Sequence, residues 1–256
     1  MGTSKPNSLG GSPRWSGPRD ELRDLAGEVI RPPAKQSAGG AVSLGNSLLK
    51  AQSADPRFLP LLEDCSIKVA LRGLLALAEA VIVRRLSISA LLKEYGIETV
   101  AESPGFALSK ALDDGFIERL IQECAGKITD SDEKVRIAML HAFVEMVTGE
   151  KAAQSLLKVT ANEIHNALRQ QNSLAIAGIF YSNYLATVLK FLVASSEAGL
   201  APAAEQHINE RLRRDYCDLI ARKLVNRARS KGWNASSIPD RVSEWQDLLE
   251  GEQMHV

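Results

Sequence analysis

Aromatic residues are scarce in this sequence, at 5% of 256 residues, although hydrophobic residues make up 45%. The apolar content comes mostly from Ala, Leu, Ile and Val, a mixture that favours helices over aromatic-rich β-sandwiches. An excess of charge is also missing, because 31 Lys and Arg balance 31 Asp and Glu. This neutrality removes any whole-molecule attraction to nucleic acid or to an acidic membrane surface, and it leaves only local patches to consider.

Cysteine is sparse, with Cys65, Cys124 and Cys217 far apart; Cys124 and Cys217 lie within expected helices and Cys65 lies at the start of one. An odd number of cysteines without a CxxC pair indicates reduced thiols in a reducing compartment, rather than disulfides or a zinc site. The N-terminus lacks the apolar run of a signal peptide. We therefore expect an intracellular, cytoplasmic protein, and the same features leave a nuclear location open.

One apolar segment, from Leu174 to Ala194, approaches the length of a membrane span. It contains Ser182, Asn183 and Lys190, and polar or charged side chains are costly within a bilayer. The segment therefore predicts a buried core helix, and a membrane is not expected as a partner.

Catalytic and cofactor motifs are missing as well: the sequence has no GxSxG, GxGxxG or HExxH. The Gly-Lys pair at 126–127 lacks the upstream Gly of a P-loop and is followed by Ile128 instead of Ser or Thr. The acidic turn at 130–133 does not fit an EF-hand, since Val135 and His141 stand where Gly and Glu are required. We expect no enzyme activity, no cofactor and no metal; the remaining alternative is an enzyme whose site assembles only in three dimensions.

Residues 1–55 are rich in Gly, Ser and Pro. This composition predicts a flexible N-terminal arm, because it offers too little apolar surface to offset the entropy of ordering the chain. Within the arm, residues 18–30 predict a short amphipathic helix, either a docking segment or a marginal helix. An all-helical domain follows at 56–233, and residues 234–256 form a C-terminal tail with a short helix.

Within the domain, apolar spacings of three and four residues predict a succession of helices, and no sustained β alternation is present. Gly, Pro and capping residues set the expected boundaries. The fold class is therefore all-α, a helical-hairpin domain preceded by the arm. The expected helices are 66–95, 104–125 with a break near Asp113, 131–148, 152–169, 173–198 and 202–231.

The segment Ala111–Ile121 and its continuation Asp130–Val144 share a pattern. A short helix carries Gly115, an apolar helix and an acidic turn follow, and the pair Val135-Arg136 enters the next helix. This pattern resembles an armadillo or HEAT repeat unit. The resemblance implies an α-solenoid-like stack of helical hairpins and a protein-binding scaffold without chemistry of its own. No fixed period extends along the chain, so an irregular helical domain stays open as the alternative.

The last long helix is the strongest candidate for a binding surface. Its cations outnumber its acids, and several share one stripe at about 100° per residue. The spacings Arg211 to Asp215, Arg214 to Asp218 and Asp218 to Arg222 favour internal ion pairs, whereas no acid follows Arg222 in this helix. The candidate surface consists of Arg211, Arg214, Arg222, Lys223, Arg227, Arg229, Lys231 and Trp233.

These features predict a non-enzymatic scaffold, adaptor, or assembly or structural subunit whose partner is another protein. The alternative is a nucleic-acid-binding structural protein of nucleocapsid or coat type. In that alternative, the cations of the late helix contact phosphates and Trp233 stacks on bases.

Overall fold

The computed structural model describes residues 13–28, 38–54, 65–98, 104–113, 115–117, 119–120, 133–149, 159–196, 198–234 and 237–241. Within these ranges the chain is helical and contains no β-strand, which confirms the all-α class.

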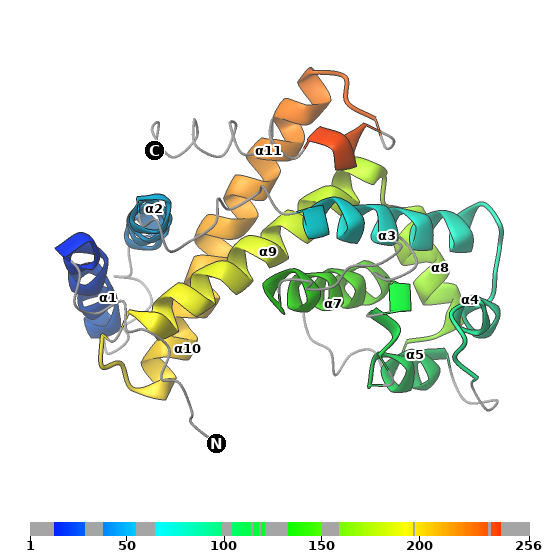
Figure 1. The fold of residues 1–256 in the computed structure, drawn as a ribbon, viewed down its shortest axis with the longest axis horizontal. Helices are drawn as coiled ribbons and strands as arrows, with labels where there is room; N and C mark the ends of the chain where they lie inside the picture. Colours follow the sequence, from blue (N-terminus) through cyan, green and yellow to red (C-terminus); the bar gives the residue numbers. More distant parts are fainter. Residues whose placement is uncertain are drawn as a thin grey trace.

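Helix α9 (Ser173–Ser195) runs diagonally through the centre of the molecule (Figure 1). It begins as predicted, where Oδ1 of Asn172 accepts a hydrogen bond of 2.9 Å from the N–H of Ala175. Helices from both sides pack against it. Among the described residues, α9 alone has the length and apolar composition of a membrane span, and 72% of its most apolar window is buried inside the protein. The prediction of a core helix for this segment is confirmed.

One group of helices packs on the right-hand side of α9 in Figure 1. Helix α7 covers α9, and α3 and α8 pack against α7 in turn. Phe143 of α7 contacts Phe116, with ring centroids 5.6 Å apart, and Phe116 contacts Tyr95 at 5.3 Å. The helices of this group are α3 (Cys65–Ile82), α4 (Ile88–Glu94), α5 (Pro104–Asp113), α7 (Glu133–Thr148) and α8 (Ala161–Arg169).

The last long helix crosses α9 on its other side and has three parts: α10 (Pro202–Arg211), a π-helical segment η5 (Leu212–Cys217) and α11 (Asp218–Ser230). Gly178 allows α9 and α11 to approach closely, because a Cβ at this position would lie 2.8 Å from Cγ2 of Val225.

Two helices lie within the segment predicted to be a flexible arm: α1 (Ser16–Glu28), preceded by the short turn η2 (Pro13–Trp15), and α2 (Ala38–Ser53). Trp15, Leu22, Leu44 and Leu48 are fully buried. For the segments 13–28 and 38–54 the prediction of a flexible arm is therefore wrong, whereas the predicted short helix at 18–30 corresponds to α1. Residues 1–12 and 29–37 lie outside the described residues.

The docking of these two helices has a clear physical cause. Apolar side chains recur at helical spacing in both helices. Helix α2 packs against η5, and α1 packs against α2 and α10. Gly45 lies directly against the ring of Tyr216, and the Tyr216 hydroxyl donates a hydrogen bond of 2.9 Å to Oδ1 of Asn46. The helical body thus includes α1 and α2 and does not begin at residue 56.

The helix predicted for 66–95 is two helices. The N–H of Leu86 donates to the carbonyl of Ala80 at 3.3 Å and closes α3. Ser87 then starts α4, since its side chain accepts from the N–H of Ala90 at 3.2 Å. The helix predicted for 152–169 begins at a capping box on Thr160, and residues 150–158 lie outside the described residues.

The resemblance to an armadillo or HEAT unit stays a prediction. Helix α7 packs against α9, α8 and α3, and α5 packs against α4. The segment 121–132, which connects the two helices of the expected unit, lies outside the described residues. At the C-terminus, a short 3₁₀ turn η6 (Ile238–Arg241) is described, and the predicted tail helix beyond it lies outside the described residues.

Candidate binding groove

The late basic helix has the predicted extent, but its winding changes in the middle. In η5 the backbone forms π-helical hydrogen bonds, which join residues five apart instead of four. Because the turn widens, side chains on either side of η5 lose the alignment that a continuous α-helix gives them. Of the three ion pairs predicted from i, i+4 spacing, Arg211–Asp215 forms, with Nε and Oδ2 3.9 Å apart. Neither of the other two, which both involve Asp218, forms as predicted. Short π segments within α-helices frequently occur at functional sites.

Arg211, the first predicted surface residue, is buried, with 2% of its side chain exposed. Its Nη1 donates to Oε2 of Glu28 at 2.8 Å, and its Nε lies 3.9 Å from Oδ2 of Asp215. Helix α1, which supplies Glu28, packs against α10 at this point. The prediction that Arg211 belongs to an exposed binding surface is therefore wrong, because its charge joins two helices inside the fold.

The next two predicted pairs involve Asp218, and neither forms as expected. Arg214 pairs with the adjacent Asp215, through contacts of 2.7 and 3.0 Å. The Asp218 carboxylate accepts a hydrogen bond of 2.6 Å from the hydroxyl of Ser182 on α9. Arg222 reaches only the backbone oxygen of Asp218, to which its Nε donates at 3.1 Å.

A groove lies between α9 and the η5–α11 segment, and we call it the α9–α11 groove. Its volume is about 610 Å³. Three of the predicted cations, Arg214, Arg222 and Arg229, line it. The other lining residues are mainly small or apolar: Ala175, Gly178, Ile179, Ala221 and Val225, together with Glu145, Ser182, Asp218 and Asn226. The groove therefore combines an apolar floor with a rim of arginines.

The two carboxylates of the groove are engaged by a residue that the sequence analysis did not single out, Arg213 of η5. Its Nη2 donates to Oε2 of Glu145 at 2.8 Å, and its Nε lies 3.9 Å from Oδ1 of Asp218. Its Nη1 donates to Oδ1 of Asn183 at 2.7 Å, and the Asn183 amide donates to Glu145 at 3.1 Å. Asn183 itself is 1% exposed. This network fixes α7, α9 and η5 at one end of the groove.

The charge that the groove presents is therefore positive. Glu145 and Asp218 face Arg213, and Arg214 faces Asp215. Arg222 and Arg229 are exposed, and among the described residues neither forms an ion pair with a carboxylate. Arg229 has one long hydrogen bond, of 3.4 Å, to Oδ1 of Asn226. These two guanidinium groups are the cations best placed to meet a ligand.

The remaining predicted residues lie outside the groove lining. Lys223 is half-buried and Arg227 is exposed on α11. The Trp233 ring is half-buried and has Lys231 Nζ 5.5 Å and Arg241 Cζ 6.0 Å from its centroid. Both distances are typical of cation–π contacts. The indole is therefore already in contact with two cations of the protein itself, which counts against its predicted use as a stacking platform for bases.

His141 of α7 lies in the electrostatic field of the same network. Desolvation, then the positive charges of Arg213 and Lys190, lower its pKa below the ordinary value of 6.5, against the opposing charge of Glu145. The His141 residue is exposed to solvent. The neutral form of His141 is favoured, which limits repulsion with Arg213.

Comparisons with protein-family models, curated proteins and solved structures found no match to this chain. Cys217, the cysteine whose side chain is described, is buried and forms no disulfide with another described residue. No group of three metal-binding side chains occurs in the described part of the chain. The groove presents cations above an apolar floor, an arrangement suited to binding an anionic, amphipathic ligand.

Proposed function

We propose that this protein is a scaffold that docks an acidic, amphipathic helix of a partner protein in the α9–α11 groove. The observation that carries the proposal is the pairing of an apolar floor with two arginines, Arg222 and Arg229, that have no carboxylate partner among the described residues. A helix laid in a groove presents an apolar stripe to the floor and polar residues to the rim. Acidic residues along the rim then complete the charge complementarity.

The dimensions of the site suit this occupant. Arg222 and Arg229 stand seven residues apart, about two turns of α11, so their guanidinium groups follow the length of the groove. Val225 lies between them along α11, Ala221 directly precedes Arg222, and both form the α11 side of the floor. A partner helix with acids at the same two-turn spacing therefore meets both arginines while its apolar face covers Val225.

Nucleic-acid binding is the weaker alternative. It requires several exposed cations and a free aromatic face, but Arg211 is buried, Arg214 is paired with Asp215 and the Trp233 ring is in contact with Lys231. An apolar floor is also of little use for contacts with phosphates. A folded partner with an acidic amphipathic helix matches more of the groove.

The test uses the full chain, tagged and immobilised, with proteins from its source cells. We expect a stoichiometric partner that contains an acidic amphipathic segment, and a synthetic peptide of that segment should compete with it. The double variant Arg222→Glu/Arg229→Glu should weaken peptide binding at least tenfold, because two rim attractions become repulsions of about 1 kcal/mol each. The variant Lys93→Glu/Lys110→Glu, which reverses two exposed cations on α4 and α5, is the matched control and should bind as the wild type does.

Two results would contradict the proposal. One is a partner whose affinity is the same for the groove variant and for the control. The other is binding of labelled single-stranded RNA at low salt that is lost in Arg222→Glu/Arg229→Glu and declines steeply with salt, which would favour the nucleic-acid alternative.

A further inference from the structure

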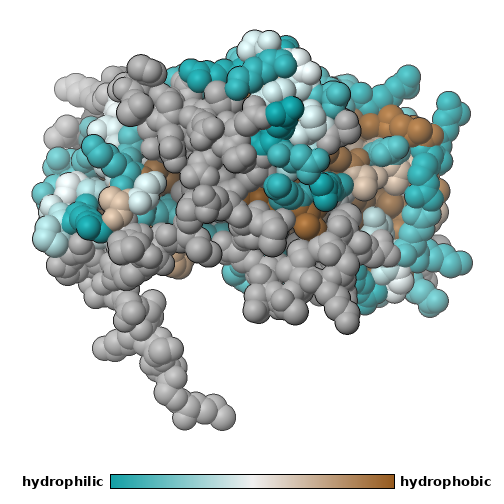
Figure 2. Space-filling view, turned by 45° about the horizontal axis from the view of Figure 1, so that its top comes forward, coloured by the Kyte–Doolittle hydropathy of each residue, from teal (hydrophilic) through white to brown (hydrophobic). Residues whose placement is uncertain are grey.

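A second cavity, of about 420 Å³, lies between the end of α3 and α8. Its walls combine three apolar and three nitrogen-bearing side chains, and no carboxylate is among them. Figure 2 shows hydrophobic surface gathered, with hydrophilic surface beside it, at the right-hand end of the molecule, where α3, α4 and α8 lie in Figure 1. The lining residues are Val81, Ile82, Arg85, Leu86, His165 and Arg169.

Helix α8 holds two of the nitrogen-bearing groups rigidly. His165 and Arg169 stand four residues apart, so they share one face of the helix. Ile164 and Leu168 each stand one position before them, about 100° away around the helix, and they are buried and anchor this adjacent face of α8. The capping box at Thr160 fixes where the helix begins. Helix α8 therefore forms a rigid wall of the cavity, held in place by its buried side chains and by its N-terminal capping box.

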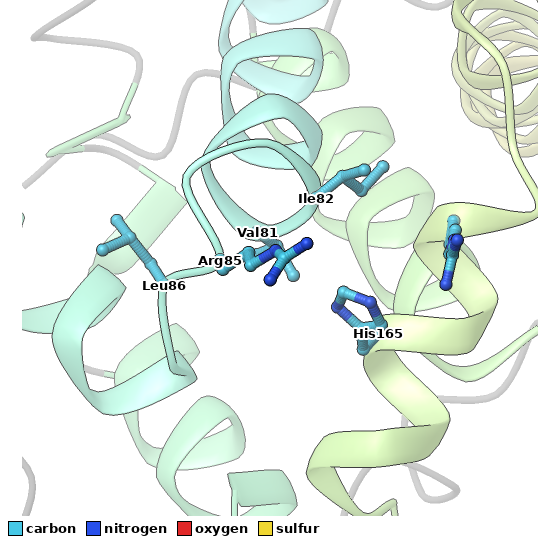
Figure 3. Close-up of a pocket in the computed structure, with 6 residues that line it drawn as sticks. Val81, Ile82, Arg85, Leu86 and His165 are labelled. Atoms are coloured by element: carbon cyan, nitrogen blue, oxygen red, sulfur yellow. The ribbon is translucent and has the colours of Figure 1, made fainter.

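Arg85 supplies the third nitrogen-bearing group from the loop after α3. Figure 3 shows its side chain extending into the space that His165 faces from α8. Among the described residues, neither Arg85 nor Arg169 forms an ion pair. The neighbouring Arg84, by contrast, pairs with Glu94. Two guanidinium groups and an imidazole therefore converge on a cavity, and no carboxylate is among its described lining residues.

The backbone of Arg85 gives independent evidence that its side chain matters. Its φ is +53°, which makes it the one residue other than glycine with a positive φ in the described part of the chain. It occupies the left-handed position that closes α3, where the N–H of Leu86 returns to the carbonyl of Ala80. Glycine usually fills this position because any side chain is strained there. Strained residues of this kind concentrate at functional sites.

We propose that this cavity binds an organic phosphate monoester, that is, a phosphate group attached to a small apolar body. A phosphate carries a charge of about −1.5 to −2 at pH 7, which matches several cationic donors better than a carboxylate does. Arg85 and Arg169 pair with the phosphate, and His165 donates a further hydrogen bond. Val81, Ile82 and Leu86 receive the apolar body. The volume lies within the range of small-molecule sites, about 300–1,000 Å³.

The test is calorimetric titration of the full chain with phenyl phosphate. Inorganic phosphate, benzoate and phenol serve as parallel ligands that each lack one feature of the probe. We expect phenyl phosphate to bind at least tenfold more tightly than any of the three. Equal affinity for inorganic phosphate would contradict a role for the apolar walls, and equal affinity for benzoate would contradict selection of a phosphate.

The replacement Arg85→Gly separates binding from folding. Glycine adopts the positive φ without strain, so the melting temperature should stay equal or rise, while the dissociation constant for phenyl phosphate should increase at least tenfold. Arg169→Gln should also weaken binding at least tenfold. Arg84→Gln removes an adjacent cation outside the cavity lining and should leave the dissociation constant within twofold.

The competing explanation is that Arg85 and Arg169 only complement the partial negative charge at the C-terminal ends of α3 and α8. In that case phenyl phosphate would release no heat on titration, and Arg85→Gly would lower the melting temperature. Either result would overturn the proposed site. The proposal does not depend on the α9–α11 groove, since the two cavities share no lining residue.

Discussion

Replacing Gly45 with alanine tests whether α2 is docked as the structure has it. A Cβ at position 45 would lie 2.6 Å from both Cγ and Cδ1 of Tyr216, closer than real Cβ contacts occur. The Tyr216 ring cannot move aside easily, because it is fully buried and its hydroxyl is held by Asn46 at 2.9 Å. The added methyl group must therefore push α2 away from η5.

The expected cost is the difference between two effects. Overpacking of a tightly packed site costs about 1–3 kcal/mol. Replacing a helical glycine by alanine returns about 0.5–1 kcal/mol through backbone entropy. We therefore expect Gly45→Ala to destabilise the protein by about 1 kcal/mol, measured by urea unfolding followed by circular dichroism. In a chain of this size that change lowers the melting temperature by about 2–4 °C.

Gly40→Ala is the matched control within the same helix. A Cβ at position 40 would lie 2.9 Å from Cδ1 of Leu25, which is the end of a flexible side chain and can rotate away. The helix then gains the propensity of alanine at little steric cost, and stability should stay equal or rise. If Gly45→Ala raised stability as much as Gly40→Ala does, α2 would not be packed on Tyr216 and the prediction of a flexible arm would stand.

Three further changes test other parts of the fold. Glu28→Ala removes the carboxylate that lies 2.8 Å from the buried Arg211 and should lower the free energy of unfolding in urea by about 2 kcal/mol. Adding Arg211→Met to that variant should recover most of the lost stability. Additive effects in the double-mutant cycle would argue against a coupled pair. Asn172→Ala removes the N-cap of α9 and should lower the free energy of unfolding by about 1 kcal/mol. An unchanged melting temperature would contradict this capping role. Because the pKa of His141 is lowered in the folded state, the unfolded chain binds more protons near and below pH 6.5, and the free energy of unfolding should fall as pH decreases through that value. His141→Gln should measurably flatten this pH dependence. An identical pH profile for the variant would contradict the lowered pKa.

Local signals in the sequence were sufficient for the helices whose boundaries depend on nearby residues. Asn172 caps α9, Gly149 follows α7 with a φ of +69°, and Pro202 opens α10. Each of these residues acts on its own backbone within a few positions, so one sequence contains the whole cause. The buried character of α9 was also visible, because apolar residues surround its axis on all sides.

The packing of α1 and α2 on the rest of the protein could not be predicted from the sequence, for a physical reason. Composition treats Gly45 as a sign of flexibility, whereas in the fold this glycine is what allows the Tyr216 ring to lie against α2. Leu44 and Leu48 stand one turn apart and are fully buried, but their complementary surface lies far along the chain. Entropy arguments from composition cannot include a surface of that kind.

The candidate site was predicted in part. Arg222 and Arg229 line the groove as members of the expected cationic stripe, because α11 is a regular helix over that stretch. Arg211 could not be placed, since its burial depends on Glu28 in another helix. The π-helical winding of η5 leaves no periodic signal in six residues. The sequence also did not indicate Arg85, because its proposed role depends on α3 ending at that point and on His165 lying across the cavity.

The zero net charge of the chain hides an uneven distribution of its cations. In the late helix, Arg211, Arg213 and Arg214 each have a carboxylate partner, so these acids are not available to neutralise cations elsewhere. Positive charge therefore collects at Arg222 and Arg229 in the groove, and separately in the cavity beside α8. A neutral composition thus excludes only attraction by the whole molecule. Because coulombic attraction between exposed groups is screened within about 10 Å at ordinary salt, each cluster should select its own anion, and removing the charge of one should leave binding at the other unchanged.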